Sequence, residues 1–278
     1  SNDTNTTTLE LCNGLSGNYT INPSGSGLTN YTTFTAARTD LVNCGVSGPV
    51  TFTVSAGTYT EQVLLTAISG ASSTNTITFD GGTGNAATRI LTSAGTSSTN
   101  AYTLRLNGSS YVRFRNMTIR NSGSSFANAL HIMGSSHYAQ IKNCIIEITG
   151  TGTTSTGSSY IPLIINNTAD ISSPSTGSQV NFLEIDSNTT NSGYYNIFMY
   201  GSTSSPYSNS NKVRYNTMNS AYYISLLFYF QDGVRIQNNT IAMRSSGSSN
   251  SYGIQTGQSI NTGTNYSEIS GNRIYDAG

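Results

Sequence analysis

The sequence predicts an all-β chain folded as a parallel solenoid whose N-terminal end is covered by a helix. Three observations lead to this class: a short phrase recurs six times, the steps between its copies are irregular, and only one segment has helical spacing. The phrase reads apolar, variable, Asn or similar, Asn or similar, variable, apolar. Its copies are 114–119, 141–146, 185–190, 213–218, 236–241 and 269–274.

The first 49 residues are expected to form the cap of the solenoid. A short strand is predicted at 17–21. Residues 31–42 then place apolar side chains three or four positions apart, and Gly45 follows as a stop signal. An amphipathic helix in this place would close the open end of a β-solenoid. Residues 50–278 are expected to form the coils, as one continuous domain.

The strands that follow are short and bounded by Gly, Ser, Thr and Asn. They are predicted at 50–54, 61–66, 76–79, 89–92 and 102–106. Two-residue hairpin signals are sparse, with 107–108 and 232–233 as exceptions. Copies of the phrase keep the same inward and outward pattern and are separated by about one full coil. This spacing favours parallel strands that stack coil on coil, roughly 4.8 Å apart.

Placing the copies in register turns the phrase into rows of stacked side chains. Two apolar rows are expected to form the core. The turn row ends in four consecutive asparagines, which are Asn188, Asn216, Asn239 and Asn272. We interpret them as an amide ladder that also satisfies the turn backbone, although Asn tolerates turn dihedral angles in any case.

Charged side chains flank the first apolar row and are expected to point outward. Nine of the chain's 24 charged residues fall on this face, largely in complementary order. The predicted ion-pair ladder comprises Lys142, Glu184, Asp186, Lys212, Arg214, Arg235 and Glu268. A catalytic interpretation would make Glu184 and Asp186 a carboxylate pair. The ladder is favoured, because cations on both sides keep these acids ionised and unsuited to donate a proton.

Composition indicates an extracellular protein. Only 9% of residues are charged and the formal net charge is zero, which argues against a nucleic-acid partner and an anionic membrane surface. The longest apolar run, 224–230, is too short for membrane insertion. Cys12 and Cys44 could form one disulfide between the first strand and the cap, which the sequence leaves open. Cys144 fills a core position, and no cofactor or metal is expected.

Three segments resemble the N-terminal cap and first coils of right-handed parallel β-helix proteins. They are 30–37 (NYTTFTAA), 43–54 (NCGVSGPVTFTV) and 57–63 (GTYTEQV). The chain looks most like large secreted surface proteins of the Bacteroidetes group, within the pectin lyase-like superfamily. The resemblance covers nearly the whole chain and implies a single-stranded, right-handed parallel β-helix. It implies no one activity, since the superfamily mixes lyases, hydrolases, esterases and non-catalytic adhesins.

The motifs that the enzymes of that superfamily are expected to carry do not occur in the sequence. Asn-Thr-Asp, Asp-Asp, Gly-His-Gly and Arg-Ile-Lys are all missing. The two histidines have no neighbouring acid, and His131 is expected to face outward from a strand. A non-catalytic protein is therefore favoured over a polysaccharide lyase or glycoside hydrolase, which remains the alternative together with a glycan-binding β-helix.

Aromatic residues and the open end supply the remaining hypotheses. In two runs of neighbouring coils, 194–200 and 222–230, the residues that alternate inward and those that alternate outward are both apolar. Their sheet is therefore expected to carry a hydrophobic outer face. This face is either covered by loops 150–160 and 168–180 or used as an interface or glycan surface. The candidate interface residues are Tyr200, Tyr222, Tyr223, Phe228, Tyr229 and Phe230. The chain ends just after a copy, which favours continuation or self-association beyond Gly278. The function expected is a structural or adhesive surface protein or a filament subunit. A low-ranked third class, an ice or glycan-surface binder, rests on an outward row rich in threonine.

Overall fold

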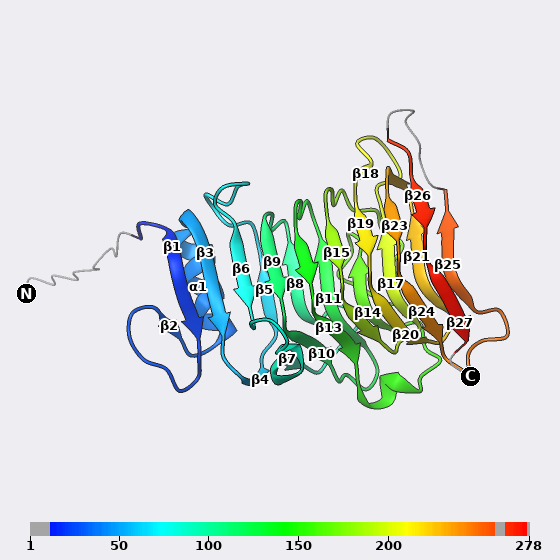
Figure 1. Cartoon of the computed structure of the whole chain (residues 1–278), viewed down its shortest axis with the longest axis horizontal. Coiled ribbons are helices and arrows are strands. Elements are labelled where there is room, and N and C mark those ends of the chain that lie inside the picture. The colour runs from blue at the N-terminus through cyan, green and yellow to red at the C-terminus, as the bar shows by residue number, and fades with distance from the viewer. Residues whose placement is uncertain (1–11, 259–264, 277–278) are drawn as a thin grey trace, which may run out of the picture.

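The predicted parallel β-helix with a helical cap is confirmed. The computed structural model describes residues 12–258 and 265–276; residues 1–11 of the expected cap and the terminal 277–278 lie outside them. The chain winds through three long sheets in turn, and every strand pair is parallel (Figure 1). Parallel strands with both faces occupied read as short apolar runs, which is how these strands appear in the sequence.

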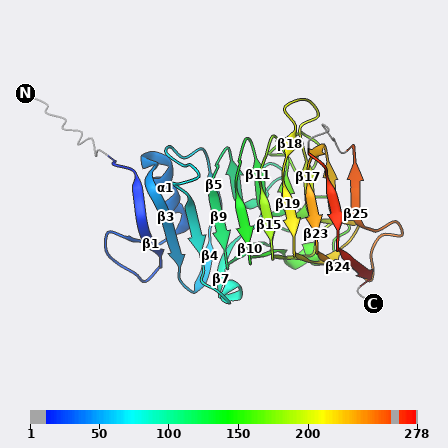
Figure 2. The ribbon, with the colours of Figure 1, turned by 45° about the horizontal axis from the view of Figure 1, so that its top comes forward.

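Sheet A carries the first strand of each repeat copy and extends along the whole molecule (Figure 2). Its strands, in spatial order, are β2 (Asn30–Tyr31), β1 (Leu15–Ile21), β3 (Val46–Val54), β6 (Ile77–Asp80), β9 (Val112–Arg115), β12 (Gln140–Lys142), β15 (Glu184–Asp186), β19 (Lys212–Arg214), β23 (Arg235–Gln237) and β26 (Glu268–Ser270).

Sheet B carries the second half of each copy and follows sheet A after a two-residue turn in all six copies. Its strands are β4 (Gly57–Thr60), β7 (Arg89–Ser93), β10 (Thr118–Asn121), β13 (Ile145–Ile148), β16 (Thr189–Asn191), β20 (Thr217–Ala221), β24 (Thr240–Met243) and β27 (Arg273–Asp276). The first turn residue has a positive φ in all six copies, from 54° at Asn143 to 64° at Gly271. Asn and Gly tolerate this backbone region best, which explains their recurrence in the phrase.

Sheet C completes each coil. Its strands are β5 (Val63–Leu65), β8 (Tyr102–Asn107), β11 (Ala127–Met133), β14 (Tyr160–Ile165), β17 (Tyr195–Tyr200), β21 (Ile224–Tyr229) and β25 (Tyr252–Gly257). A small fourth sheet pairs β18 (Ser208–Asn209) with β22 (Gln231–Asp232). Two short 3₁₀ turns lie at Ala86–Thr88 and Gly150–Thr153.

The two predicted apolar rows lie in the core. Along sheet A, Phe52, Phe79 and Phe114 stack at centroid distances of 4.8 Å. The rows stay buried until the last described coil, where Ile269 and Ile274 are about half exposed, at 49% and 50%. These two side chains occupy core positions of a coil on which no further described coil stacks.

Helix α1 (Phe34–Cys44) forms the predicted lid, shifted by three residues from the predicted start because Thr33 is its N-cap. The Thr33 hydroxyl accepts a hydrogen bond from the Ala36 amide at 3.0 Å. Glu61, from the following coil, accepts from the Phe34 and Thr35 amides at 3.0 and 2.8 Å. A carboxylate at a helix N-terminus satisfies free amides and complements the helix dipole. This contact fastens the helix to the first coils.

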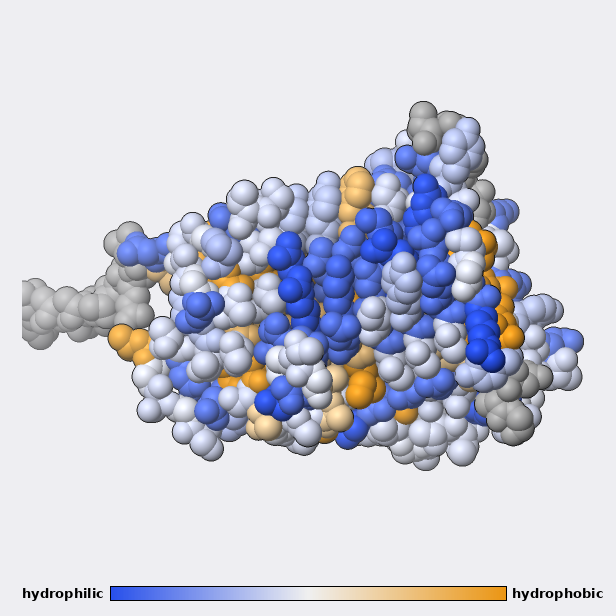
Figure 3. Space-filling view, viewed as in Figure 1, coloured by the Kyte–Doolittle hydropathy of each residue, from blue (hydrophilic) through white to orange (hydrophobic). Residues whose placement is uncertain are grey.

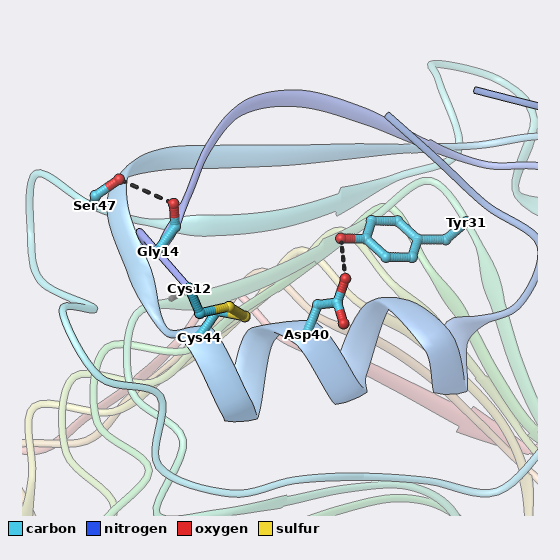
Figure 4. Close-up of a disulfide and its surroundings, with 6 residues drawn as sticks. All are labelled: Cys12, Gly14, Tyr31, Asp40, Cys44 and Ser47. Atoms are coloured by element: carbon cyan, nitrogen blue, oxygen red, sulfur yellow. Dashed lines mark hydrogen bonds between the residues drawn. A yellow bond between two sulfur atoms is a disulfide. The ribbon is translucent and has the colours of Figure 1, made fainter. Parts of the chain in front are cut away.

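A disulfide joins Cys12 to Cys44 beside the last turn of α1 (Figure 4). In the same cap, the Tyr31 hydroxyl donates to Asp40 at 2.9 Å, and burial followed by this bond raises the pKa of Tyr31. β1 and β3 pair as neighbours in sheet A, and β3 already begins at Val46. The first coil strand therefore starts before residue 50, where the sequence placed the end of the cap.

Candidate functional site

The four ladder asparagines are stacked in the turns between sheets A and B. The Asn216 amide oxygen accepts from the Asn188 backbone amide at 2.9 Å and from its side-chain Nδ2 at 3.0 Å. Asn239 and Asn272 repeat the arrangement on the next coils. Each Nδ2 also donates to a backbone carbonyl one coil back, as Asn216 does to Ile185 at 2.8 Å. These amides are committed to the scaffold, so this row offers no binding groups.

The charged and polar side chains that point outward from the later strands of sheet A, β9 to β26, form what we call the charged face. Its residues are Arg113, Arg115, Gln140, Lys142, Glu184, Asp186, Lys212, Arg214, Arg235, Gln237, Glu268 and Ser270. In Figure 3 hydrophilic side chains form a band across the middle strands of this sheet. The face is positioned by the alternation of the strands, because these residues flank the buried first apolar row.

The two acids of β15 are the centre of the ion-pair ladder. Glu184 contacts Lys142 at 2.9 Å and Lys212 at 3.1 Å, and Asp186 contacts Arg214 at 2.7 Å. Burial raises the pKa of Glu184, but the two lysines outweigh burial and the net pKa lies below its usual value. Glu184 is therefore held as a carboxylate, which does not suit a general acid, and Asp186 is engaged by Arg214. Arg235 and Glu268 form a more exposed pair at 3.7 Å.

A file of aromatic rings borders the charged face where the sheet A strands begin. The file consists of Tyr111, Tyr138 and Phe182, each two residues before the first residue of the charged face on its strand. The ring centroids of neighbouring members are 4.8 and 4.7 Å apart, and the ring planes are within 4° of parallel. All three have a positive φ, between 55° and 60°. This ring file was missed at the sequence level, although its signal is visible as an aromatic residue at one repeat position in three successive copies.

The ring file stops after Phe182, and a trough opens there. The next two residues in the row are Ser210 and Gly233, and the row resumes with an aromatic residue at Tyr266. Two adjoining hollows of 390 and 210 Å³ occupy this interval. Their lining residues are Tyr138, Gln140, Phe182, Glu184, Ser210, Lys212, Gly233, Arg235, Asn265 and Tyr266. We call this interval the trough.

The trough combines an aromatic wall with exposed cations. Phe182 is 41% exposed, with one ring face against Tyr138 and the other toward the coil of Ser210. Lys212 and Arg235 have 38% and 37% of their side chains exposed, more than the other ion-paired cations of this face. An apolar ring surface next to a few polar groups is the usual composition of a site that binds a ring-shaped polar ligand.

The outer face of sheet C is covered by the chain itself. Ile171, from the segment after β14, is fully buried against Ile164, Phe198 and other side chains of this face. Of the two expected loops, 168–180 thus supplies a covering side chain. Tyr200, Tyr222, Tyr223, Tyr229 and Phe230 remain half-buried around the cover. Phe228, which the sequence placed with them, is 1% exposed and belongs to the inner core, because alternation turns it inward.

His131 lies on the outward side of β11, as expected, but it is fully buried under this cover. Its Nδ1 accepts from Arg105 Nε at 3.2 Å, and its Nε2 lies 2.7 Å from the Asn166 amide oxygen. Arg105 also donates to the carbonyls of Thr99 and Ala169. Burial, followed by the adjacent Arg105, lowers the pKa of His131 to about 3. These hydrogen bonds among His131, Arg105 and Asn166 hold the covering segment against sheet C. His131 is therefore not accessible for proton transfer with a ligand.

Cys144 is the free thiol among the described residues; it is buried in the turn row, one coil before Asn188. Burial raises its pKa to about 12, which leaves no thiolate for nucleophilic chemistry near neutral pH. In the described part of the chain, no three His, Cys, Asp or Glu side chains are grouped to hold a metal ion. Within the same residues, no helix is long and apolar enough to cross a membrane.

Comparison with solved structures shows a similarity to a bacterial protein. The crystal structure of Escherichia coli YbhC aligns with a TM-score of 0.49 at 16% identity, covering 92% of this chain and 71% of that one. No protein-family model matches the chain, and no curated protein matches it.

Proposed function

We propose that this chain is a non-catalytic, extracellular β-helix domain that adheres to glycans through the trough of sheet A. The observation that carries the proposal is the uncovered face of the Phe182 ring, which opens onto Lys212 and a hollow of 390 Å³. Sugar rings present flat apolar patches surrounded by hydroxyls, so an aromatic face beside hydrogen-bonding side chains suits them. The rigid stack of coils holds these groups in place without an induced change.

The ion-pair ladder supports a role without catalysis. A glycoside hydrolase needs one carboxylic acid that is protonated near its working pH, and a lyase needs a free base. The most enzyme-like acids, Glu184 and Asp186, are each held by cations within 3.1 Å. The Cys12–Cys44 disulfide, together with the low charge of the chain, supports an extracellular location.

Binding to a panel of immobilised neutral and charged polysaccharides tests this function. We expect Phe182→Ala to weaken binding about tenfold, since an exposed aromatic anchor contributes about 1–2 kcal/mol. Tyr215→Ala removes a ring that is 59% exposed in the turn on the other side of sheet A and serves as the matched control. No binding to any polysaccharide, or equal losses in both variants, would contradict the proposal. Release of shortened sugars by the wild-type chain would favour the alternative, a polysaccharide-active enzyme.

A second role, in assembly, is favoured by the last described coil. Ile254, Ile269 and Ile274 line a hollow of 360 Å³ at this end, and Ile269 and Ile274 are about half exposed. The opposite end is closed by α1, which buries Phe34, Ala37 and Leu41. We therefore propose that this end is covered either by a second copy of the chain or by a continuation into further coils.

Sedimentation of the wild-type chain and an Ile274→Asp variant tests the assembly role. We expect a concentration-dependent dimer in the wild type and a monomer in the variant, because a charge in the apolar contact is costly to bury. Tyr275→Asp controls for charge at the same end, since neighbouring residues of a strand point to opposite faces of the sheet. A monomeric wild type at high concentration would count against pairing.

A further inference from the structure

A second row of hydrogen bonds runs along the turns that precede sheet A, directly beside the ring file. Its members, each one residue before a position of the ring file's row, are Ser110, His137, Asn181 and Asn209. The Ser110 hydroxyl accepts from the His137 backbone amide at 3.0 Å, and His137 Nδ1 accepts from the Asn181 backbone amide at 3.2 Å. The Asn181 side-chain oxygen accepts in turn from the Asn209 backbone amide at 2.8 Å. Each of these side chains therefore holds the backbone of the following coil, and we call the row the acceptor row.

The acceptor row fixes the turn that carries Phe182. Asn181 is tied to the preceding coil at both backbone groups, because its amide donates to His137 and its carbonyl accepts from the Tyr138 amide at 3.0 Å. Phe182 follows at once with a φ of 55°, a conformation that a bulky residue keeps only where its surroundings hold it. The bond to His137 thus helps to keep the Phe182 ring against Tyr138, with its other face open to the trough.

His137 is the titratable member of the acceptor row. To accept from the Asn181 N–H, its Nδ1 must be free of a proton, so the neutral ring carries its hydrogen on Nε2. A proton on Nδ1 would set two N–H groups against each other and leave the Asn181 amide without its acceptor. The oxygens that Ser110 and Asn181 contribute to the row do not change in this way.

The titratable neighbours of His137 come from three coils. Tyr111 lies on the preceding coil and donates its amide to the His137 carbonyl, and the Tyr138 ring on the same coil lies 6.5 Å from the imidazole. Phenols carry no charge in acid. Arg113 and Glu184 begin the charged face on the preceding and following coils, two residues beyond the ring file. Burial, and no charged group among the described residues, lowers the pKa of His137 below its ordinary value of 6.5.

We propose that His137 is a positioning residue for adhesion through the trough: its neutral ring holds Asn181 and Phe182 in place, and its protonation releases them. The inference rests on the proposed glycan adhesion and adds a regulation to it, release of the ligand in acid. Because the folded pKa lies below 6.5, the bond is complete above pH 6.5 and is lost as pH falls through the folded pKa. His131, the other histidine of the chain, has a pKa of about 3 and takes up its proton only in stronger acid.

Amide hydrogen exchange tests the positioning without any ligand. The peptide that contains Asn181 and Phe182 is compared at each pH between the wild type and His137→Asn, whose Oδ1 replaces Nδ1 as acceptor and does not titrate. We expect equal exchange at pH 7.5, and exchange at least about fivefold faster in the wild type than in the variant at pH 4.5. Comparison at equal pH removes the intrinsic effect of pH on exchange. Equal exchange of the two proteins at both pH values would overturn the inference.

A pH profile of adhesion tests the release. The probes are immobilised dextran, laminarin and galactomannan, which are neutral, so their charge does not change with pH. We expect the wild type to bind its best ligand at least about fivefold more weakly at pH 4.5 than at pH 7.5, with a slope of at most about tenfold per pH unit, since one group takes up one proton.

Three variants assign the profile to one side chain. His137→Asn should match the wild type at pH 7.5 and keep that affinity at pH 4.5. His137→Leu, which offers no acceptor, should bind at least about fivefold more weakly at both pH values. His131→Gln is the control and should keep the wild-type profile, because His131 lies under the cover of sheet C.

The outcomes separate the inference from the adhesion on which it rests. A His137→Asn profile that still falls like the wild type would overturn the inference and leave adhesion standing. Equal weakening by His137→Asn and His137→Leu at pH 7.5 would also overturn it, since the acceptor would then have no role. A profile abolished by His131→Gln would assign the release to His131 instead. Binding to none of the probes, with the expected difference in exchange, would remove the proposed adhesion and its release and leave His137 as the residue that positions Phe182.

Discussion

The ring of Phe182 lies parallel to that of Tyr138, with centroids 4.7 Å apart and planes 2° apart, and its other face looks toward Ser210. A ring in the middle of such a stack has both faces covered, whereas the last ring keeps one face for a ligand. The next position of the row after Phe182 is occupied by Ser210, which has no ring. One face of the Phe182 ring is therefore left free for a ligand. The same row ends in the opposite direction at Thr76, beside Tyr111.

Filling the trough should abolish adhesion without harming the fold. Ser210 has a φ of 55°, the same as Phe182 and close to Tyr138 at 57°, so its backbone suits an aromatic residue in this row. We expect the Ser210→Tyr ring to stack on Phe182, close the trough and weaken glycan binding more than about tenfold. Titration against immobilised glycan measures this, with Ser210→Ala as the control that should bind normally. Undiminished binding by Ser210→Tyr would place the ligand elsewhere.

Interrupting the asparagine ladder should destabilise the chain. Asn216→Ala leaves the Asn188 backbone amide and the Ile185 carbonyl, both buried, without their partners. At about 1–3 kcal/mol for each unsatisfied buried group, we expect a loss of about 3 kcal/mol or more in the free energy of unfolding. Urea denaturation measures it. The comparison is Asn219→Ala, which removes a part-buried bond to Asn191 and should cost about 1 kcal/mol or less. Similar losses would show that the ladder is not special.

The Glu184 ion pairs should make stability fall in acid. The pKa of Glu184 in the folded chain is below its ordinary value of 4.5, so the unfolded chain takes up the proton first as pH falls. The stabilisation is complete above pH 4.5 and is lost as pH drops through the folded pKa. We expect Glu184→Gln to cost about 1 kcal/mol at neutral pH and to lose less than the wild type at about pH 3. Parallel denaturation curves of the two proteins at both pH values would contradict this account.

His131 should add a second acid-sensitive contribution at higher pH. Its pKa falls from 6.5 to about 3 on folding, so between these values the unfolded chain binds a proton that the folded chain excludes. Stability is therefore complete above pH 6.5 and declines as pH falls toward 3, by at most about 1.4 kcal/mol per pH unit. His131→Gln, which keeps an acceptor for Arg105, should flatten this decline. His137→Gln is the comparison: burial also lowers the pKa of His137, but this side chain is only part-buried, so its replacement should flatten the decline less than His131→Gln does. An unchanged slope in His131→Gln would show that another group titrates.

Much of the scaffold is predictable from local sequence because each coil repeats the same contacts. Phe114 and Ile119 recur in register with every later copy, and the turn asparagines recur with them. Where a row is continuous, the partner of a residue is the equivalent residue of the next copy, so Glu184 and Lys212 can be paired by aligning the copies alone. This holds only while coil boundaries are evident in the sequence.

The candidate site depends on features that no single copy contains. Phe182 becomes a binding surface only because the next coil carries Ser210, and a 28-residue step separates the two positions. Phe228 looked like a surface residue in an apolar run, yet the winding of the coil turned it inward. His131 looked exposed until the segment around Ile171 folded back over sheet C. Each outcome is set by which loop lies over which sheet.

By itself, the sequence determined the repeating unit: its inward rows, its asparagine turns and the alternation of charges on one face. These are nearest-neighbour interactions, which periodicity encodes directly. Only the tertiary structure decided which ring faces remain uncovered among the described residues and which turn side chains meet. Both depend on the lengths and paths of irregular loops and on gaps in the rows. The uncovered face of Phe182 and the hydrogen bond from Asn181 to His137 are visible only once the described coils are stacked.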